Sequence, residues 1–464
     1  MIHHLRIILL TLMFCSPFAV AQLRSNTETT IRHVTVVNVV TGNELKDQTV
    51  RIQKGHIVSV TPTQEGDAAL PGAVDAHGGY LIPGLWDMHV HVHDTSELAL
   101  YIANGVTGIR IMAGEKNTAT LRAELTQEKT SPEIYLASAI VDGSPPTWPG
   151  SIIVNKPAEA RRTVDEIKAG GADFIKVYNS IPRDAYFALA DEAKQQHISF
   201  VGHVPDAVTV QEASAAGQRS IEHLQGIALG CSSRQDSLMN DLARANYFFK
   251  RLEINGEGYG SIDQKKCHAL FAEFRTNQTW QVPTLTVLGM WAHLEDSKFT
   301  SDPRLAYITH RSRERWEERT QLQRRRWTEP QYKLARTVFS VDKQIVNTMS
   351  KAAVPMMAGT DAMNPFCFPG FSLHDELALL VESGLTPLAA LQMATINPAR
   401  FLGRIAEMGT IEPGKNANLV LLRADPLADI HNTTQIQAVW LHGEYFDRDR
   451  LDQLLENVKK SAKH

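Results

Sequence analysis

The sequence predicts an α/β protein, a (β/α)8 barrel of the TIM type joined to a small β-sandwich domain built from both ends of the chain. Three observations predict this fold. The chain has 464 residues, which exceeds the about 250 residues of a typical barrel. Its middle alternates apolar segments with helical segments, as parallel sheets do. Its two ends instead carry short β-branched runs separated by turn residues.

Eight apolar segments in the middle of the chain are the strand candidates of the barrel. Helical stretches such as 183–196, 208–216 and 377–383 fall between or after most of them. The candidates are Leu85–His91, Val106–Met112, Ile134–Val141, Phe174–Tyr178, Ser199–Val204, Ser220–Leu224, Val282–Val287 and Pro355–Thr360. Two further connections, about 226–280 and 288–354, exceed ordinary loop lengths. We therefore expect them to be helical insertions at the mouth of the barrel.

The two ends of the chain are predicted to form one composite domain. β-branched runs occupy 34–40 and 49–52 near the start and 417–422 and 438–441 near the end. These boundaries place the β-sandwich in residues 22–80 and 408–464 and the barrel in residues 81–407. A terminal helix is expected over 450–460, where the helical period returns.

Residues 1–21 are predicted to be a cleaved signal peptide. Arg6 precedes an apolar run, and Ala19-Val20-Ala21 supplies the small residues of a cleavage site. The run is shorter than the about 20 residues of a membrane span, and no comparable run follows, so no stable membrane span is expected. The protein is therefore predicted to be periplasmic or secreted. An oxidising compartment would permit one disulfide among Cys231, Cys267 and Cys367; Cys231–Cys267 is one candidate, and the sequence leaves the pairing open.

Composition and charge argue against nucleic acid as a partner. Lys and Arg number 47 against 51 Asp and Glu, giving a net charge of -4, so nucleic acid is not an expected partner. A small molecule or dipeptide is the expected substrate, and a homo-oligomeric state stays open. Residues 311–326 are rich in arginine, but glutamates are interleaved among them. This pattern favours a solvated, salt-bridged helix; a lid whose arginines attract substrate carboxylates is the alternative.

Side chains with metal-binding chemistry stand at the ends of the predicted strands. Catalytic groups in such barrels lie at the carboxyl ends of strands. His89 and His91 share one face of the first strand, because alternate strand residues point the same way. The later strands end in or carry Lys176, His203, His223 and Asp361. Imidazoles and a carboxylate suit zinc or a similar divalent ion, so we predict a metal-dependent enzyme.

Three sequence motifs resemble those of the amidohydrolase superfamily. They are Leu81-Ile-Pro-Gly-Leu-Trp-Asp-Met-His-Val-His91, the region around Gly359-Thr-Asp361, and Gly409-Thr-Ile-Glu-Pro-Gly-Lys-Asn-Ala-Asn-Leu-Val420. The order His-x-His, Lys, His, His, Asp matches the binuclear, carboxylated-lysine subtype. Through Thr386-Pro-Leu-Ala-Ala-Leu-Gln-Met-Ala-Thr-Ile-Asn-Pro398 the chain is similar to prolidase-like and imidazolonepropionase-like members.

The resemblance implies a ligand set for two divalent metal ions, with Zn²⁺ the expected metal. His89, His91 and Asp361 would hold the more buried ion. His203 and His223 would hold the second. Lys176 would take up carbon dioxide as a carbamate that bridges both ions, because a protonated ammonium could not lie between two cations. An unmodified Lys176 would instead favour a mononuclear site like that of imidazolonepropionase.

The resemblance also implies a role in catalysis. Asp361 would act as the general base and acid. Position alone makes Tyr178 and His374 candidate substrate contacts: Tyr178 lies two residues past Lys176 on the same strand face, and His374 follows the eighth strand. A tyrosine that only occupies the barrel rim is the alternative for Tyr178. Arg110 matches an arginine common in this branch, but the acidic residue that commonly follows it is here Ile111, so hydrogen bonding inside the barrel is expected to differ. Residues 142–149 depart from the glycine-rich, histidine-containing stretch of dipeptidase members, which argues against a strict Xaa-Pro preference.

The predicted function is hydrolysis of amide C–N bonds in small peptides or N-acyl amino acids, as in Xaa-Pro dipeptidases or carboxypeptidases. Cyclic-amide hydrolysis, lactone hydrolysis and phosphotriester hydrolysis are the enzymatic alternatives, because a metal-activated hydroxide serves all of them. A barrel that only binds a metal or ligand is the non-enzymatic alternative, since a fold alone does not establish a reaction.

Overall fold

The computed structural model describes residues 28–127, 130–245 and 248–463. The predicted signal peptide, with its cleavage site near Ala21, lies outside the described residues. Within the described ranges, no helix combines the length and the apolar character that crossing a membrane requires.

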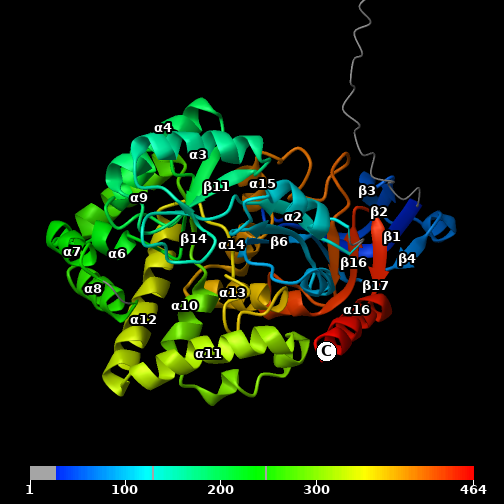
Figure 1. Ribbon diagram of the computed structural model, residues 1–464. Helices are drawn as coiled ribbons and strands as arrows, with labels where there is room; N and C mark the ends of the chain where they lie inside the picture. Colours follow the sequence, from blue (N-terminus) through cyan, green and yellow to red (C-terminus); the bar gives the residue numbers. More distant parts are fainter. Residues whose placement is uncertain (1–27, 128–129, 246–247, 464) are drawn as a thin grey trace, which may run out of the picture.

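Strands from both ends of the chain pair in one sheet, where blue and red ribbons meet in Figure 1. Its order is β17-β16-β15-β5-β1-β2-β3, and β4 pairs with β1. The strands are β1 (Glu28–Val37), β2 (Glu44–Gln53), β3 (His56–Pro62), β4 (Ala73–Asp75), β5 (Tyr80–Pro83), β15 (Leu419–Leu422), β16 (Ile436–Leu441) and β17 (Glu444–Asp447). Because β5 pairs with both β1 and β15, the hydrogen bonding of this sheet is continuous, and the sheet borders a separate apolar core around Ile31 and Trp440.

The middle of the chain contains two parallel sheets. One is β6-β7-β8, and the other is β10-β9-β11-β12-β13-β14. Their strands are β6 (Leu85–Val90), β7 (Val106–Ile111), β8 (Glu133–Leu136), β9 (Val141–Asp142), β10 (Ile152–Ile153), β11 (Phe174–Val177), β12 (Ser199–Gly202), β13 (Ser220–Glu222) and β14 (Trp280–Val282). Single parallel bridges connect Ala137 with Phe174, Gln281 with Met356, and Val90 with Ala362.

Three of the predicted strands differ in the structure. The strand expected over 134–141 is divided into β8 and β9, which belong to different sheets. A strand was expected over 282–287. The observed strand, β14, ends at Val282, and most of the predicted range belongs to a helix that begins at Leu285. The segment 355–360 is not a regular strand. Met357 donates to Gln281 and Ala358 donates to Met393, so this segment divides its hydrogen bonds between different neighbours instead of forming one ladder.

Helices follow most of the parallel strands, as the alternating pattern predicts. They are α1 (Leu98–Ala103), α2 (Thr118–Leu125), α3 (Pro157–Ala169), α4 (Arg183–Gln195), α5 (Val210–Ala215), α13 (Phe371–Glu382), α14 (Pro387–Met393), α15 (Ile396–Leu402) and the terminal α16 (Arg448–Ser461). Local sequence fixes several of their starts. At α5, for example, Thr209 and Glu212 form a capping box that satisfies the first backbone N–H groups. Short 3-10 helices occupy Glu65–Ala69, Thr95–Glu97, Ser297–Phe299, Pro303–Tyr307 and Ile430–Thr434.

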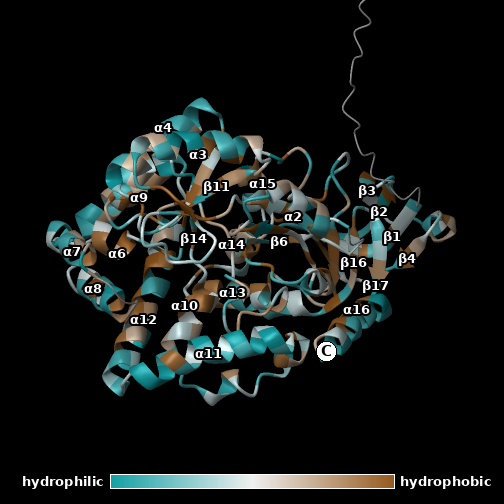
Figure 2. Ribbon diagram, viewed as in Figure 1, coloured by the Kyte–Doolittle hydropathy of each residue, from teal (hydrophilic) through white to brown (hydrophobic). Residues whose placement is uncertain are grey.

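The two long connections are helical, as predicted. The first contains α6 (Ile227–Gly230), α7 (Gln235–Leu242), α8 (Phe248–Gly260) and α9 (Gln264–Asn277); the second contains α10 (Leu285–Ala292), α11 (His310–Arg326) and α12 (Glu329–Lys351). The disulfide left open by the sequence joins Cys231 to Cys267 and so ties α6 to α9. Cys367 is a buried free thiol. The hydropathy colours of Figure 2 show α11 as mostly hydrophilic beside the apolar interior.

Candidate metal centre and substrate cavity

His89 and His91 are brought to one point by β6. His89 is fully buried, and His91 follows the last residue of the strand. The carboxylate of Asp361 lies beside both rings: its Oδ1 is 2.9 Å from His91 Nε2 and 3.3 Å from His89 Nε2. Asp87 positions the loop that carries this carboxylate, because it accepts hydrogen bonds from the backbone N–H and hydroxyl of Thr360.

His203 and His223 approach the same point from β12 and β13. Their ring centroids are 5.0 Å apart, and the His223 ring lies 4.6 Å from that of His89. Strict strand alternation would place the neighbours Glu222 and His223 on opposite faces. His223 instead has a φ of 59°, and this left-handed conformation brings its ring to the side on which Glu222 contacts His89.

Three of the four histidines are held through Nδ1. His89 Nδ1 contacts Glu222 at 2.8 Å, His203 Nδ1 contacts Asn179 at 2.8 Å, and His223 Nδ1 contacts Thr284 at 2.7 Å. Partners of this kind fix the tautomer and ring orientation of metal-binding histidines. The Nε2 atoms are thereby left for another ligand.

The donor atoms fit a divalent metal ion. His89 Nε2 is buried and makes no hydrogen bond to any residue that the structure describes. Ligand atoms of His89, His223 and Asp361 all lie within 4.8 Å of one another. The structure thus groups His223 with His89 and Asp361, whereas the resemblance pairs His223 with His203.

Charge states at this point also suit a metal. Burial lowers the pKa values of His89 and His203 well below the ordinary range, so their imidazoles are neutral and can coordinate. Burial alone would raise the pKa of Asp361, but His223 and the hydrogen bond with His91 outweigh it and lower that pKa. The Asp361 carboxylate is therefore ionised at neutral pH.

Lys176 is buried in β11 beside these groups. Burial lowers the pKa of its amine to about 8, although Glu222 and Asp361 act in the opposite direction. A Cβ at Gly202 would lie 2.9 Å from Lys176 Cδ. Glycine at this position therefore leaves the space that the Lys176 side chain occupies. A fraction of neutral amine is what carbamate formation requires.

Glu222 is a site residue that the sequence reasoning missed. Besides His89, it contacts the buried Arg110, whose Nη2 lies 2.9 Å from Glu222 Oε1. Arg110 also donates to Ser220 Oγ at 2.9 Å. Ile111 is apolar, and the acidic partner of Arg110 comes from β13. Its sequence signal was its position directly before His223.

Tyr178 lines the open side of the metal centre. Its ring stacks on His203 at a centroid distance of 3.9 Å, and its hydroxyl oxygen accepts a hydrogen bond from Trp148 Nε1 at 2.9 Å. Burial raises the pKa of this hydroxyl to about 12. Tyr178 is therefore a neutral hydrogen-bond donor beside the site, as its predicted role in substrate binding requires.

The prediction that His374 contacts substrate is corrected. His374 is buried on α13, where Nδ1 contacts Thr433 Oγ1 at 2.9 Å and Nε2 contacts the backbone oxygen of Asn104 at 3.0 Å. Both ring nitrogens are therefore used in joining three chain segments. His374 is also absent from the residues that line the cavity at the metal centre.

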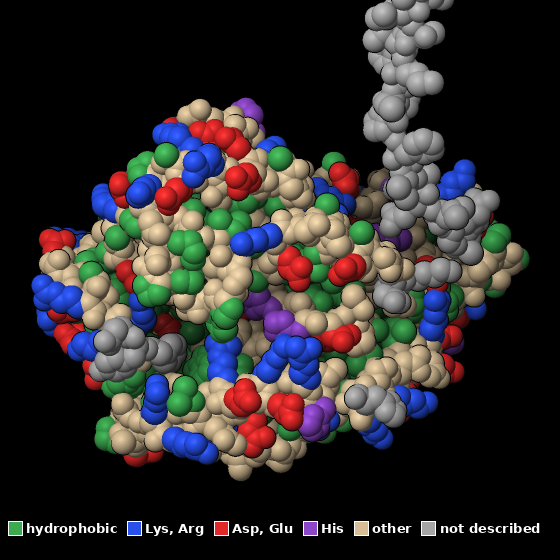
Figure 3. Space-filling view, viewed as in Figure 1, with side chains coloured by type: hydrophobic (Ala, Val, Ile, Leu, Met, Phe, Trp, Pro, Cys, Tyr) green, Lys and Arg blue, Asp and Glu red, His purple; other side chains and the backbone are tan. Residues whose placement is uncertain are grey.

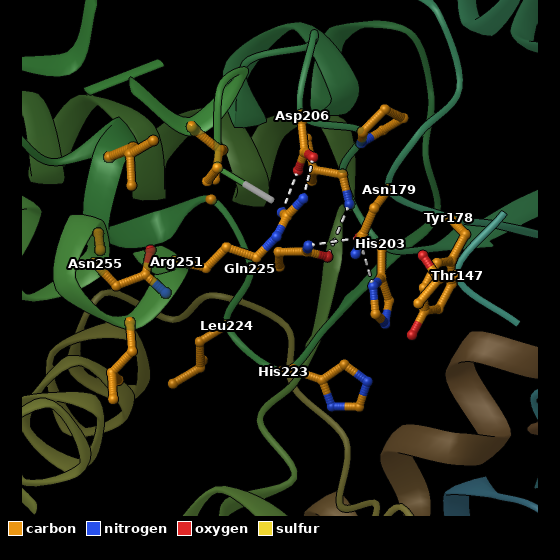
Figure 4. Close-up of a pocket in the computed structure, with 18 of the residues that line it drawn as sticks. Thr147, Tyr178, Asn179, His203, Asp206, His223, Leu224, Gln225, Arg251 and Asn255 are labelled. Atoms are coloured by element: carbon orange, nitrogen blue, oxygen red, sulfur yellow. Dashed lines mark hydrogen bonds and ion pairs between the residues drawn. The ribbon is translucent and has the colours of Figure 1, made fainter. Parts of the chain in front are cut away.

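A cavity of about 890 Å³ opens from the metal centre. Figure 4 shows His203, His223 and Tyr178 facing one open space, with Arg251 and Asp206 paired farther along the wall. We call its far part the apolar lobe; it is lined by Leu252 of α8, Leu288 of α10, Val338 and Phe339 of α12, and Trp327 between α11 and α12. The space-filling view in Figure 3 shows histidines inside a hollow, with Lys and Arg side chains along its edge over α11.

Solved structures show the same fold. A bottromycin amidohydrolase superposes with a TM-score of 0.72 at 24% sequence identity, covering 94% of this chain and 90% of that chain. A Xaa-Pro dipeptidase with bound methionine superposes with a TM-score of 0.66 at 19% identity, covering 91% of this chain and 100% of that chain.

Sequence comparison gives a family. An adenine deaminase from Moorella thermoacetica is 22% identical over 410 residues, which are 87% of this chain but 56% of that protein. The chain thus spans little more than half the length of this curated relative. The model of the amidohydrolase family matches residues 80–445. The chain belongs to the amidohydrolase family.

Proposed function

We propose that the protein is a metal-dependent hydrolase that cleaves amide C–N bonds of small peptides or N-acyl amino acids. The observation that carries this proposal is the convergence of Nδ1-tethered histidines on the ionised carboxylate of Asp361. Its family membership and the dipeptidase among its structural neighbours support the same reaction class.

The metal would be held by the strand-end residues. We propose that His89, His91, His203, His223 and Asp361 would hold two divalent ions, with Zn²⁺ as the metal, and that Lys176 would join this ligand set as a carbamate. Bound zinc supplies Lewis acidity and lowers the pKa of a water molecule toward neutrality. The lowered pKa of Lys176 supports the carbamate, because only the neutral amine reacts with carbon dioxide.

Asp361 is proposed to move the proton during hydrolysis. Its carboxylate is ionised and lies among the imidazoles, so it can accept a proton from the attacking water and deliver it to the leaving nitrogen. Tyr178 accepts from Trp148, which leaves its own O–H free to donate to the substrate carbonyl oxygen. Glu222 acts through His89, whose ring it orients.

We also propose a closed barrel for the middle of the chain and a periplasmic or secreted location. The cyclic order of the two parallel sheets and their single bridges supports a closed (β/α)8 barrel over residues 81–407, with residues 22–80 and 408–464 as the second domain. The Cys231–Cys267 disulfide supports a periplasmic or secreted protein, because such bonds persist in oxidising compartments.

The test is a screen of the zinc-supplied protein against dipeptides and N-acyl amino acids, read as released free amine. We expect release that a chelator abolishes and that added zinc restores. A protein that binds metal, leaves every amide intact and hydrolyses lactones or phosphotriesters would refute the proposed reaction.

A further inference from the structure

Arg319 is a cation held at the rim of the cavity. It projects from α11 and is solvent-exposed within the cavity lining. Its guanidinium carbon lies 5.1 Å from the ring centroid of Trp148 and 5.3 Å from that of Trp291. Contacts with two indole rings restrict the side chain without neutralising its charge.

One hydrogen bond joins Arg319 to the loop of the catalytic carboxylate. Arg319 Nη1 donates to Asn364 Oδ1 at 2.6 Å, and Asn364 Nδ2 donates to the backbone oxygen of Asp361 at 2.9 Å. Among the described residues no other hydrogen bond and no carboxylate partner is formed by this guanidinium. Its remaining N–H groups are available to a ligand next to Asp361.

The contact with Trp148 also connects the guanidinium to the metal centre. Trp148, which contacts Arg319, donates to the hydroxyl of Tyr178, and Tyr178 stacks on His203. Arg319 is thus connected to the site through both Asp361 and His203. A group bound by Arg319 would lie close to the bond that is cleaved.

The second arginine of the cavity is already neutralised. Arg251 forms a two-point ion pair with Asp206, in which Nη1 donates to Oδ1 at 2.6 Å and Nη2 donates to Oδ2. An ion pair of this geometry satisfies the fork of the guanidinium. Arg319 is therefore the lining arginine that can pair with an incoming anion.

The size and lining of the cavity indicate the rest of the ligand. A volume of about 890 Å³ is at the upper end of the range for pockets that enclose drug-sized molecules, and a dipeptide would leave much of it unfilled. The apolar lobe can remove a large hydrocarbon group from water, and the free energy of binding becomes more favourable with each methylene that is buried.

We propose that Arg319 binds the free carboxylate of the substrate and that the apolar lobe binds its acyl group. The substrate class is therefore N-acyl amino acids with a long aliphatic or aromatic acyl group. This inference rests on the proposed amide hydrolysis and specifies its substrate.

The test compares matched substrates that differ only in the carboxylate. N-octanoyl derivatives of glycine, leucine, phenylalanine and proline are offered as free acids and as carboxamides, and the released amine is quantified. We expect a kcat/KM for the acids that is about 10- to 100-fold above that for the carboxamides, since a hydrogen-bonded charge is lost in the latter.

Substitutions on α11 test whether Arg319 causes the preference for free acids over carboxamides. Arg319→Gln should bring the ratio of kcat/KM for the acids to that for the carboxamides close to one, mainly by raising KM for the acids. Arg319→Lys should retain part of the preference. Arg325→Gln is the matched control, because Arg325 is an exposed arginine on the same helix outside the cavity lining.

The outcomes separate this inference from the proposed function. Metal-dependent cleavage of acids and carboxamides at equal rates would overturn the carboxylate site and leave amide hydrolysis standing. The same holds if Arg319→Gln and Arg325→Gln behave alike. No cleavage of any amide by the metal-loaded protein would overturn both.

Discussion

The floor and the roof of the cavity differ in how their polar groups are held. On the floor, strand ends supply histidines whose Nδ1 atoms are fixed by Glu222, Asn179 and Thr284. On the roof, helices of the two insertions supply an apolar lobe and Arg319, whose guanidinium has no carboxylate partner among the described residues. A fixed floor suits bond cleavage, whereas an available cation and apolar walls suit selection of a substrate.

The largest effect is expected on the floor, from Asp361→Asn. Loss of the proton-accepting carboxylate should lower kcat by about 10²- to 10⁴-fold, measured with the best substrate of the amide screen. Asp165→Asn, the same substitution at an exposed aspartate of α3 outside the cavity lining, is the control and should retain hydrolysis. Equal turnover by Asp361→Asn and the wild type would show that the floor does not use this carboxylate.

Glu222→Gln should weaken metal binding without removing a ligand. The His89 ring loses its charged partner, which typically costs about 10- to 100-fold in metal affinity or activity, and Arg110 is left buried beside a neutral amide. We therefore also expect a lower melting temperature. Metal titration and thermal unfolding would measure both effects. Glu97→Gln, at another buried glutamate, is the control; matching metal affinities for the two variants would contradict the role of Glu222.

Leu288→Trp tests the roof alone. The larger side chain should occupy part of the apolar lobe and lower kcat/KM for N-octanoyl substrates by roughly 10-fold, a loss of the size that misfit in an apolar pocket produces. N-acetyl substrates, which do not reach the lobe, should be unaffected. Leu322→Trp, at an exposed leucine of α11, should change neither. A uniform loss for all chain lengths would argue against an acyl-binding lobe.

The smallest effect concerns Asp342 in the wall of the lobe. Burial raises the pKa of Asp342 to about 7, although its hydrogen bond with Tyr259 acts in the opposite direction. Between about pH 4, where the unfolded carboxyl titrates, and about pH 7, the unfolded state loses this proton first, so this group destabilises the fold as pH rises. Asp342→Asn should therefore gain stability relative to the wild type over this interval, measured by denaturant unfolding. A stability difference that is independent of pH would contradict the raised pKa.

The same comparison explains what could be predicted from the sequence. The periodicity of the predicted strands indicated that His89, His91, Lys176 and His203 lie near one another, because the ends of parallel strands meet at one edge. The same periodicity did not indicate Glu222, because strand alternation directs neighbouring side chains to opposite faces and His223 had been assigned to the site. The positive φ of His223, which brings both side chains to the site, was not visible in the sequence.

The helices were predicted at the correct positions, but the side chains that they direct toward the cavity were not. Residues 311–326 do form a helix, but the mixture of Arg and Glu favoured a fully solvated surface, whereas Trp316 is buried and Arg319 reaches the cavity. His374 was assigned to the site from its place after the eighth segment, yet α13 directs it toward Asn104 and Thr433. Which helix face meets the cavity depends on tertiary packing, and a single sequence does not contain that information.

The most direct test of the central claim measures hydrolysis and metal content on one preparation. The account predicts two divalent ions per chain, loss of amide hydrolysis when they are removed, and recovery when zinc is returned. Full hydrolysis by the metal-free protein would contradict the account.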